Sequence, residues 1–209
     1  MPLILAFDAA GGRCAAALVR GGRVLAARAE ATDRREAERL IPVLEATLAE
    51  GGAAWSDLDA IAVSTGPGDF TGVRVAVATA RGLALALDRP AIGVSRLEAL
   101  AVGHADALVA VDARRGMVAA QAFTGGAPRA PAALVALEDL AGLAPPGARR
   151  LGAAAAPGAP EAAEAPDPAA IARLAAARLG DPGPPPAPIY LRPPDAAPGE
   201  PAPRLLDDA

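Results

Sequence analysis

The sequence predicts an α/β protein made of two related lobes. Short apolar runs typical of strands alternate with longer segments in which apolar residues recur at helical spacing. The run Ile4–Ala9 (ILAFDA) recurs without gaps as Leu108–Ala113 (LVAVDA), 104 residues later, and a glycine and a second apolar run follow each copy. Such self-similarity indicates a duplicated unit. The chain has 209 residues, of which 53% are hydrophobic, so it is long enough to bury a sizeable core.

The first lobe is expected over residues 1–95. Its elements are predicted from apolar runs, glycine-containing turns and helical periodicity. Gly21-Gly22 joins the second and third of three antiparallel strands, and Gly51-Gly52 ends the helix that follows. In chain order the predicted elements are strands 3–7, 14–19 and 24–26, helix 34–50, strand 60–64, helix 71–87 and strand 90–94.

The second lobe, expected over residues 96–192, gives weaker signals because much of it is rich in Ala, Pro and Gly. Pro168 is suited to the first turn of the last helix. In chain order the predicted elements are a short helix over 97–101, strands 108–112 and 118–123, a helix near 134–140, helix 168–179 and an ordered segment at 189–191. The Pro-rich tail, residues 193–209, is expected to be disordered.

The amino-acid composition excludes several kinds of chemistry. All 20 basic residues are arginine, so the chain has no P-loop lysine and no Schiff-base lysine. One histidine (His104) and one cysteine (Cys14) cannot build a zinc site from the usual ligands, whereas a carboxylate-only Mg²⁺ site stays open. A single cysteine forms no intrachain disulfide, which fits the cytoplasmic location that we expect. The net charge of −4 argues against a stand-alone nucleic-acid-binding protein.

The two most apolar stretches predict neither a signal peptide nor a membrane span. Met1–Phe7 has no basic residue and is followed at once by Asp8, which favours a strand. Val73–Leu87 contains Arg74 and Arg81 and is shorter than a bilayer requires. We therefore expect no membrane partner.

Residues 66–74 (GPGDFTGVR) lie between a predicted buried strand and a predicted helix. Glycines permit positive φ and close approach of the backbone, and Asp69 or Thr71 is placed to accept hydrogen bonds from the first helical amides. Free amides at such a terminus bind anions, but an ordinary capped turn explains the segment equally well, because GxGxxG and Walker spacing are absent. A carboxylate at Asp69 would also compete with phosphate for the same amides.

This loop closely resembles the GPGSFTGLR segment of the bacterial TsaB (YeaZ) family. Further matches lie on both sides of it and keep the family's order. They are Ile4–Asp8, Arg39–Pro42, Ile92–Ser95, Val111–Arg114 and Pro188–Arg192. The resemblance covers most of residues 3–123 together with 188–192, and the combination of motifs is highly specific.

The resemblance implies an actin-like fold of the Hsp70 and sugar-kinase (ASKHA) type, with two duplicated lobes that each hold a mixed sheet flanked by helices. It also implies the dimerisation subunit of the bacterial machinery that makes N6-threonylcarbamoyladenosine next to the anticodon of tRNA. In that family TsaB is a non-catalytic scaffold. The paralogous subunit TsaD holds the catalytic metal and transfers the threonylcarbamoyl group, and the ATPase TsaE joins the complex.

From the resemblance we expect this chain alone to bind no metal and no cofactor, with ATP or ADP at the interface of the complex. We expect tRNA to be reached only through the complex, and a homodimer to be an option for the unpartnered chain. Three groups of candidate residues follow. The partner- or nucleotide-binding loop comprises Gly66, Pro67, Gly68, Asp69, Phe70, Thr71, Gly72 and Arg74. The partner-facing helix residues are Glu36, Leu40, Val73, Val77, Ala80 and Arg81, and the inter-lobe cleft residues are Asp8, Asp112 and Arg114.

Two of these assignments have competing interpretations. Asp112 and Arg114 also fit a pair that stabilises a turn, and we favour that interpretation. Helix 71–87 carries small residues at four-residue spacing, which permits close approach either of its own sheet or of a partner helix. These residues are Gly72, Ala76, Ala80 and Ala84.

The chain departs from the family pattern at three places. Asp8-Ala9-Ala10 lacks the hydroxyl groups that a phosphate-binding hairpin needs, including the threonine that relatives usually have after the aspartate. Asp69 replaces the usual serine, an exchange that a helix cap tolerates but a phosphate site does not. Glu36 stands where many relatives have histidine. The first two departures agree with a catalytically inert subunit, and no role of the family's histidine is carried over.

Two other function classes find less support in the sequence. An ATP-dependent sugar or acyl kinase of the same fold needs hydroxyl-bearing loops, which Ala9-Ala10 and Arg114-Arg115 do not supply. A peptidase is disfavoured because His104 is the only histidine and no G-x-S-x-G motif is present. His104 is expected in an exposed loop, and Cys14 is expected to be a buried small hydrophobe.

Overall fold

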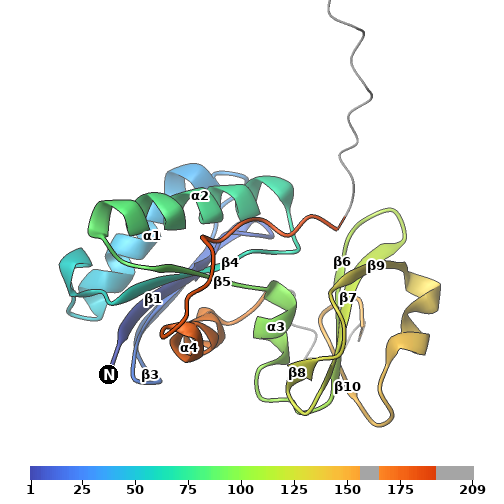
Figure 1. Cartoon of the computed structure of the whole chain (residues 1–209). Coiled ribbons are helices and arrows are strands. Elements are labelled where there is room, and N and C mark those ends of the chain that lie inside the picture. Colours follow the sequence, from blue (N-terminus) through green and yellow to red (C-terminus); the bar gives the residue numbers. More distant parts are fainter. Residues whose placement is uncertain (156–164, 192–209) are drawn as a thin grey trace, which may run out of the picture.

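The computed structural model describes residues 1–155 and 165–191. These residues form two five-stranded sheets with helices packed on their faces (Figure 1). The predicted tail, residues 193–209, lies outside the described residues.

The first sheet has the strand order β3-β2-β1-β4-β5. Its strands are β1 (Leu3–Asp8), β2 (Arg13–Arg20), β3 (Arg23–Ala31), β4 (Ala60–Ser64) and β5 (Ala91–Val94). The first three are antiparallel, as predicted, and β4 and β5 run parallel to β1. Strand β3 extends well beyond the predicted residues 24–26. Its second half is mostly exposed, so it lacks the apolar pattern that marks a strand.

Helices α1 (Glu36–Glu50) and α2 (Phe70–Leu87) cover one face of this sheet. Their apolar stripes join the inward side chains of β1, β2 and β4 in one buried cluster. A single 3-10 turn, η1 (Trp55–Asp57), leads from α1 towards β4. Both helices begin within two residues of the predicted positions.

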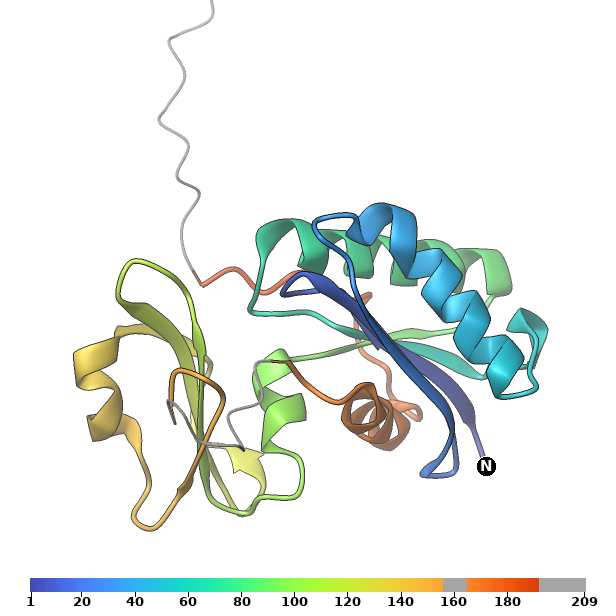
Figure 2. The ribbon, with the colours of Figure 1, turned by 180° about the vertical axis from the view of Figure 1, so that it is seen from behind.

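Helix α4 (Pro168–Arg178) covers the opposite face of the first sheet (Figure 2). Ile171, Ala172 and Ala175 are buried with Ile4 and Ile92 in a second apolar cluster. The prediction placed this helix in the second lobe, over residues 96–192, and in this respect it was wrong. Strands β1 and β4 are buried along their whole length, so other elements must pack on both faces of the sheet. The periodicity of the sequence does not show which helix packs on the second face.

The second sheet has the order β10-β6-β7-β8, and β9 also pairs with β7. Its strands are β6 (Ala107–Asp112), β7 (Met117–Thr124), β8 (Ala127–Pro128), β9 (Ala133–Ala136) and β10 (Arg149–Leu151). Helix α3 (Arg96–Ala101) packs on one face, and the 3-10 segment η2 (Leu137–Leu143) packs on the other. The helix predicted near residues 134–140 was wrong, because Leu134–Ala136 pairs with β7 and only the residues after it turn.

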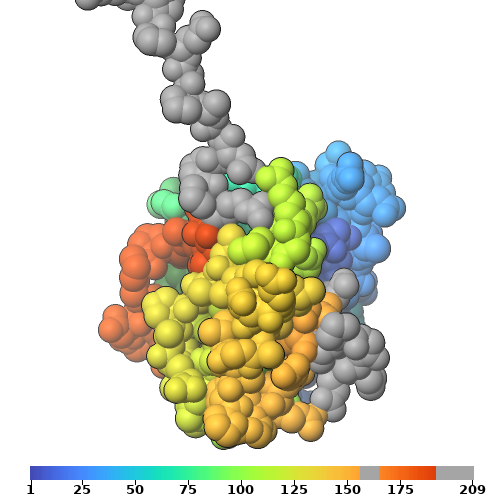
Figure 3. Space-filling view, turned by 90° about the vertical axis from the view of Figure 1, so that its right-hand side faces the viewer, coloured from blue at the N-terminus to red at the C-terminus, as the bar shows by residue number. Residues whose placement is uncertain are grey.

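The C-terminal described segment, which we call the strap (Pro186–Leu191), is extended and joins both lobes. The Ile189 amide donates to the Thr65 carbonyl at 2.9 Å in the first lobe. Leu191 packs against the apolar cluster of the second sheet that includes Leu97 and Phe123. Figure 3 shows this red segment beside the yellow and orange second lobe. The ordered segment predicted at 189–191 is therefore confirmed. It connects the two lobes and is not part of a strand.

Candidate functional site

The turn that leads into α2 is a capped helix start. Asp69 is the N-cap residue, and its Oδ2 accepts a hydrogen bond from the Gly72 amide at 2.9 Å. Of the two candidate caps, Asp69 is therefore the one that the structure uses, with Thr71 inside the helix. Gly66 and Pro67 are buried beneath it. The carboxylate occupies one of the amides that an anion would need.

The first turn of α2 lies directly on the turn that follows β1. A Cβ atom on Gly72 would lie 2.9 Å from the carbonyl carbon of Ala9 and closer still to its oxygen. Val73 and Val77 pack on Ala10. Ala9 and Ala10 are completely buried, so the turn that lacks hydroxyl groups is also closed over by α2.

Asp8, at the end of β1, lies inside the first lobe rather than on an open cleft. Its side chain is buried, and Oδ1 accepts from the Ala10 amide at 3.3 Å. Burial raises the pKa of the Asp8 carboxyl above its ordinary value of 3.8, although the Arg96 and Arg13 guanidinium groups, the Ala10 amide and the Ser64 hydroxyl act to lower it. Asp8 thus favours the protonated form in the folded protein more than in the unfolded chain.

This shift predicts a pH-dependent stability. Protonated Asp8 contributes fully below pH 3.8, and the contribution is lost as the pH rises through the higher folded pKa. We therefore expect the free energy of unfolding of the wild-type chain to fall relative to that of Asp8→Asn as the pH rises above 3.8. Urea unfolding of both proteins across a pH series measures this difference. A wild-type free energy of unfolding that stays constant or rises relative to that of Asp8→Asn as the pH rises would contradict the expectation.

Of the other two predicted cleft residues, Asp112 is the exposed last residue of β6, and Arg114 lies in the exposed turn that follows it. The Arg114 amide donates to Asp112 Oδ1 at 2.9 Å, and Arg114 has a left-handed backbone with φ of 65°. The favoured interpretation, a pair that stabilises a turn, is therefore confirmed, with the contact made by the Arg114 backbone.

Most of the residues predicted to face a partner are buried inside this chain. Leu40, Val73, Val77 and Ala80 are at most 5% exposed, and Glu36 is buried and accepts a hydrogen bond from Thr32. Their assignment to an exposed partner surface was wrong, because the apolar stripe of each helix faces its own sheet. The small-residue stripe packs the same way, since Gly72, Ala76 and Ala80 are buried. Arg81 alone among the six is exposed.

The outward face of α2 is the surface that sequence reasoning missed. Apart from Thr71 in the first turn, its exposed positions recur at helical spacing and combine apolar or very small side chains with two arginines. They are Phe70, Arg74, Ala78, Arg81, Gly82, Leu85 and Ala86. Phe70 is 56% and Leu85 is 86% exposed, which is unusual for side chains of this size. We call these seven residues the α2 outer face.

The α2 outer face also explains an unexpected property of the helix. With 18 residues, two charges and a mean hydropathy of 1.4, α2 is long and apolar enough to cross a membrane by length and composition alone. The apolar stretch predicted from the sequence, residues 73–87, is too short to span a bilayer, but the helix begins at Phe70 and is therefore longer than predicted. One such helix is weak evidence for a membrane span. What the helix does show is a large apolar surface that is left uncovered by the described part of the chain, since only 28% of its residues are buried.

At the N-terminal end of this face, Phe70, Arg74 and Tyr190 form what we call the aromatic–arginine cluster. The Arg74 guanidinium carbon lies 3.5 Å from the centre of the Phe70 ring and 5.3 Å from that of Tyr190. Arg74 Nε donates to the Tyr190 hydroxyl at 2.6 Å, and the two ring centres are 6.0 Å apart. Tyr190 lies 116 positions after Arg74, so only its place in the 188–192 motif singled it out in the sequence.

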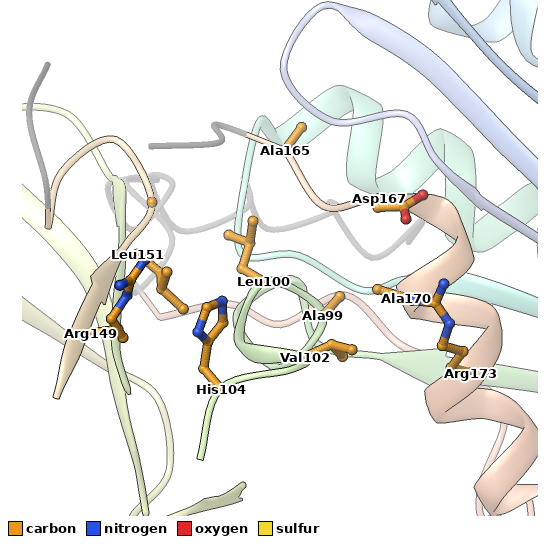
Figure 4. A pocket seen from close by; sticks show the side chains of 11 residues that line it. Ala99, Leu100, Val102, His104, Arg149, Leu151, Ala165, Asp167, Ala170 and Arg173 are labelled. Atoms are coloured by element: carbon orange, nitrogen blue, oxygen red, sulfur yellow. The ribbon is translucent and has the colours of Figure 1, made fainter. Parts of the chain in front are cut away.

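Cys14 and His104 complete the candidate residues. Cys14 is buried, as predicted, and burial together with the nearby Glu36 raises the pKa of its thiol to about 11. His104 was expected in an exposed loop but is half-buried, and it lines a pocket of about 400 Å³ between α3, β10 and α4 with Arg149, Asp167 and Arg173 (Figure 4). Within residues 1–155 and 165–191, no three His, Cys, Asp or Glu side chains are grouped so as to hold a metal ion.

Comparison with known proteins gives consistent matches. A family model described as "TsaD: tRNA N6-adenosine threonylcarbamoyltransferase" matches residues 26–177. The Escherichia coli "tRNA threonylcarbamoyladenosine biosynthesis protein TsaB" is 40% identical over 121 residues, which cover 55% of this chain and 52% of that protein. The chain thus matches about half the length of this curated relative. An uncharacterized Mycobacterium tuberculosis protein is 37% identical over 210 residues, covering 93% of this chain and 94% of its own.

Two solved structures from Pseudomonas aeruginosa share the fold. One is described as an uncharacterized protein with similarity to peptidase YEAZ. It has a TM-score of 0.78 and 32% identity, and the match covers 92% of this chain and all of that one. The other, "YeaZ from Pseudomonas aeruginosa", has a TM-score of 0.71 and 30% identity, with 85% of this chain and 93% of that one covered.

Proposed function

Because this chain belongs to the TsaB (YeaZ) family and has its actin-like fold, we propose that it is an accessory subunit for making threonylcarbamoyladenosine on tRNA. Its role is to bind the TsaD-type transferase as a non-catalytic scaffold, in a cytoplasmic complex that a TsaE-type ATPase also joins. The tRNA is contacted through that complex. Both the name of the E. coli relative and the description of the matching family model refer to threonylcarbamoyl modification, which supports this assignment.

The observation that carries the scaffold role is the α2 outer face. A helix face that exposes Phe70 and Leu85 beside Ala78 and Gly82 has the properties of a protein interface, with large apolar side chains next to positions where another backbone can approach closely. The exposed side of α1 lies on the same side of the sheet and adds Ile41, which is 37% exposed. A pair of helices from the paralogous subunit fits this surface.

The absence of catalysis by this chain alone is supported by the turn after β1. The kinase alternative needs an accessible, hydroxyl-bearing loop there, whereas Asp8, Ala9 and Ala10 are buried under α2 and carry no hydroxyl. A peptidase would need Ser64 or Ser95 as the nucleophile beside His104. This alternative finds no support, because Ser64 is fully buried and the Ser95 hydroxyl caps α3, where it accepts from the Leu97 amide. We propose that ATP or ADP binds at the interface of the complex. We also propose that the chain without its partner can form a homodimer.

The proposal is tested with Gly82→Glu, which places a charge in the middle of the α2 outer face. A Cβ at Gly82 has open space around it, so the fold is expected to survive. We expect affinity for the purified TsaD-type subunit to fall by at least about tenfold, as for a buried unpaired charge at an interface. The matched control is Ala177→Glu on the exposed side of α4, which should bind like the wild type.

Activity assays complete this test. Threonylcarbamoylation of tRNA by the reconstituted subunits should require both this chain and the TsaD-type protein, and Gly82→Glu should reduce it. ATP hydrolysis or peptide cleavage by this chain alone would overturn the non-catalytic role. Unchanged binding by a folded Gly82→Glu variant would overturn the placing of the interface.

A further inference from the structure

We propose that the aromatic–arginine cluster is the docking point for a carboxylate side chain of the partner subunit. This inference rests on the proposed function, since the cluster lies at one end of the α2 outer face. It names the chemistry that the partner must present there: an aspartate or glutamate on the surface that packs against α2.

The first argument is the state of Arg74. Its Nε is hydrogen-bonded to the Tyr190 hydroxyl, and its flat guanidinium group is stacked over Phe70. Within the part of the chain that the structure describes, the Arg74 side chain makes no ion pair and no further hydrogen bond. The terminal N–H groups of the guanidinium are therefore free to donate to an acceptor outside this chain. The planar fork of an arginine matches a carboxylate in two parallel hydrogen bonds.

The second argument is that the cluster is held in place before any partner arrives. Tyr190 belongs to the strap, which is fixed on one side by the Ile189 hydrogen bond to Thr65 and on the other by Leu191 in the second-lobe core. A guanidinium that is already oriented loses less conformational entropy when it binds. Phe70 and Tyr190 remain 56% and 54% exposed, and exposed Arg and Tyr are typical of the residues that dominate binding energy.

The third argument is charge. The chain as a whole carries a net charge of −4, yet the α2 outer face carries Arg74 and Arg81 and no acidic residue. A complementary partner surface is therefore acidic. A carboxylate is favoured over a phosphate group because the Asp69 carboxylate caps the adjacent helix terminus, where it would repel a dianion and already accepts the Gly72 amide.

The test measures the affinity of the purified TsaD-type subunit for four full-length chains: the wild type, Arg74→Gln, Tyr190→Phe and the matched control Arg150→Gln. Arg150 is an exposed arginine of β10, outside the α2 outer face and without a ring contact. We expect Arg74→Gln to bind about 10-fold to 100-fold more weakly, as for a lost hydrogen bond to a charged group. Arg150→Gln should change the affinity by less than about threefold. Tyr190→Phe keeps the ring and should lie between them.

Further readouts identify the acceptor. The wild-type affinity should fall more steeply with salt than that of Arg74→Gln. Double-mutant cycles with Asp→Asn and Glu→Gln variants of the partner should reveal one carboxylate whose loss has no added effect in Arg74→Gln. Thermal melts of each chain confirm that the variants are folded.

The outcomes separate the two proposals. If the wild type does not bind the partner, both the proposed function and this inference fail. If the wild type binds and a folded Arg74→Gln binds equally well, only the inference fails. Competition of ATP with the partner at Arg74 would assign the cluster to a phosphate group and overturn it. So would loss of a homodimer in Arg74→Gln with unchanged affinity for the partner, which would make a second copy the occupant.

Discussion

Replacing Gly72 with alanine is expected to lower the free energy of unfolding by about 3 kcal/mol, the upper end for inserting a methyl group into a packed site. The new Cβ would lie 2.9 Å from the Ala9 carbonyl carbon and 3.1 Å from the Ala10 Cα. Both obstacles are backbone atoms of a buried turn, so neither can move aside as a flexible side chain would. Relief requires α2 to shift away from β1. Urea unfolding measures the loss.

Gly82 provides the matched control, because it lies on the same helix with open space where the Cβ would go. Gly82→Ala is expected to raise the free energy of unfolding by about 0.5–1 kcal/mol, since alanine has the higher helix propensity. The two substitutions are chemically identical and are expected to have opposite signs. Equal effects would show that α2 does not pack on the β1 turn as described.

Replacing Ile171 with alanine is expected to cost about 3 kcal/mol, within the range for truncating a buried aliphatic side chain. Ile171 is completely buried between α4 and the first sheet. Its neighbours there include Ala6, Ala17 and Ala62, whose short side chains cannot fill the resulting cavity. The loss should therefore reach the full transfer and cavity cost. Thermal and urea unfolding check the value.

Ala177→Ser, on the exposed side of the same helix, should change stability by no more than about 0.5 kcal/mol. If Ile171→Ala proved equally mild, α4 would not be a part of the first-lobe core. That result would restore the predicted boundary, which assigned the helix to the second lobe.

The first lobe was well predicted because its signals are local. Apolar runs bounded by glycines marked β1, β2 and β4, and helical periodicity marked α1 and α2 to within two residues. The region after Thr124 was predicted less well. Its alanines fit helix and strand alike, so Leu134–Ala136 gave no sign that β7 would recruit them as a strand.

The candidate site was predicted in its loop and missed on its surface. The cap at Asp69 and the turn at Asp112 follow from residue type at neighbouring positions, which a sequence displays. The choice between the two faces of α2 does not, because Val73 and Leu85 are both apolar and only the sheet decides which is buried. Tyr190 reaches Arg74 through the strap, a tertiary contact that no local pattern encodes.

The position of α4 has a consequence for how the protein is made. Residues 107–151, which form the second sheet, are synthesised after β5 but before the helix that completes the first lobe. The second lobe is therefore an insertion within the first. A nascent chain that has reached residue 155 carries β1 and β4 with one face bare, so it exposes Ile4 and Ile92 until α4 emerges. The first lobe thus stays unfinished until after all strands of the second sheet have been synthesised.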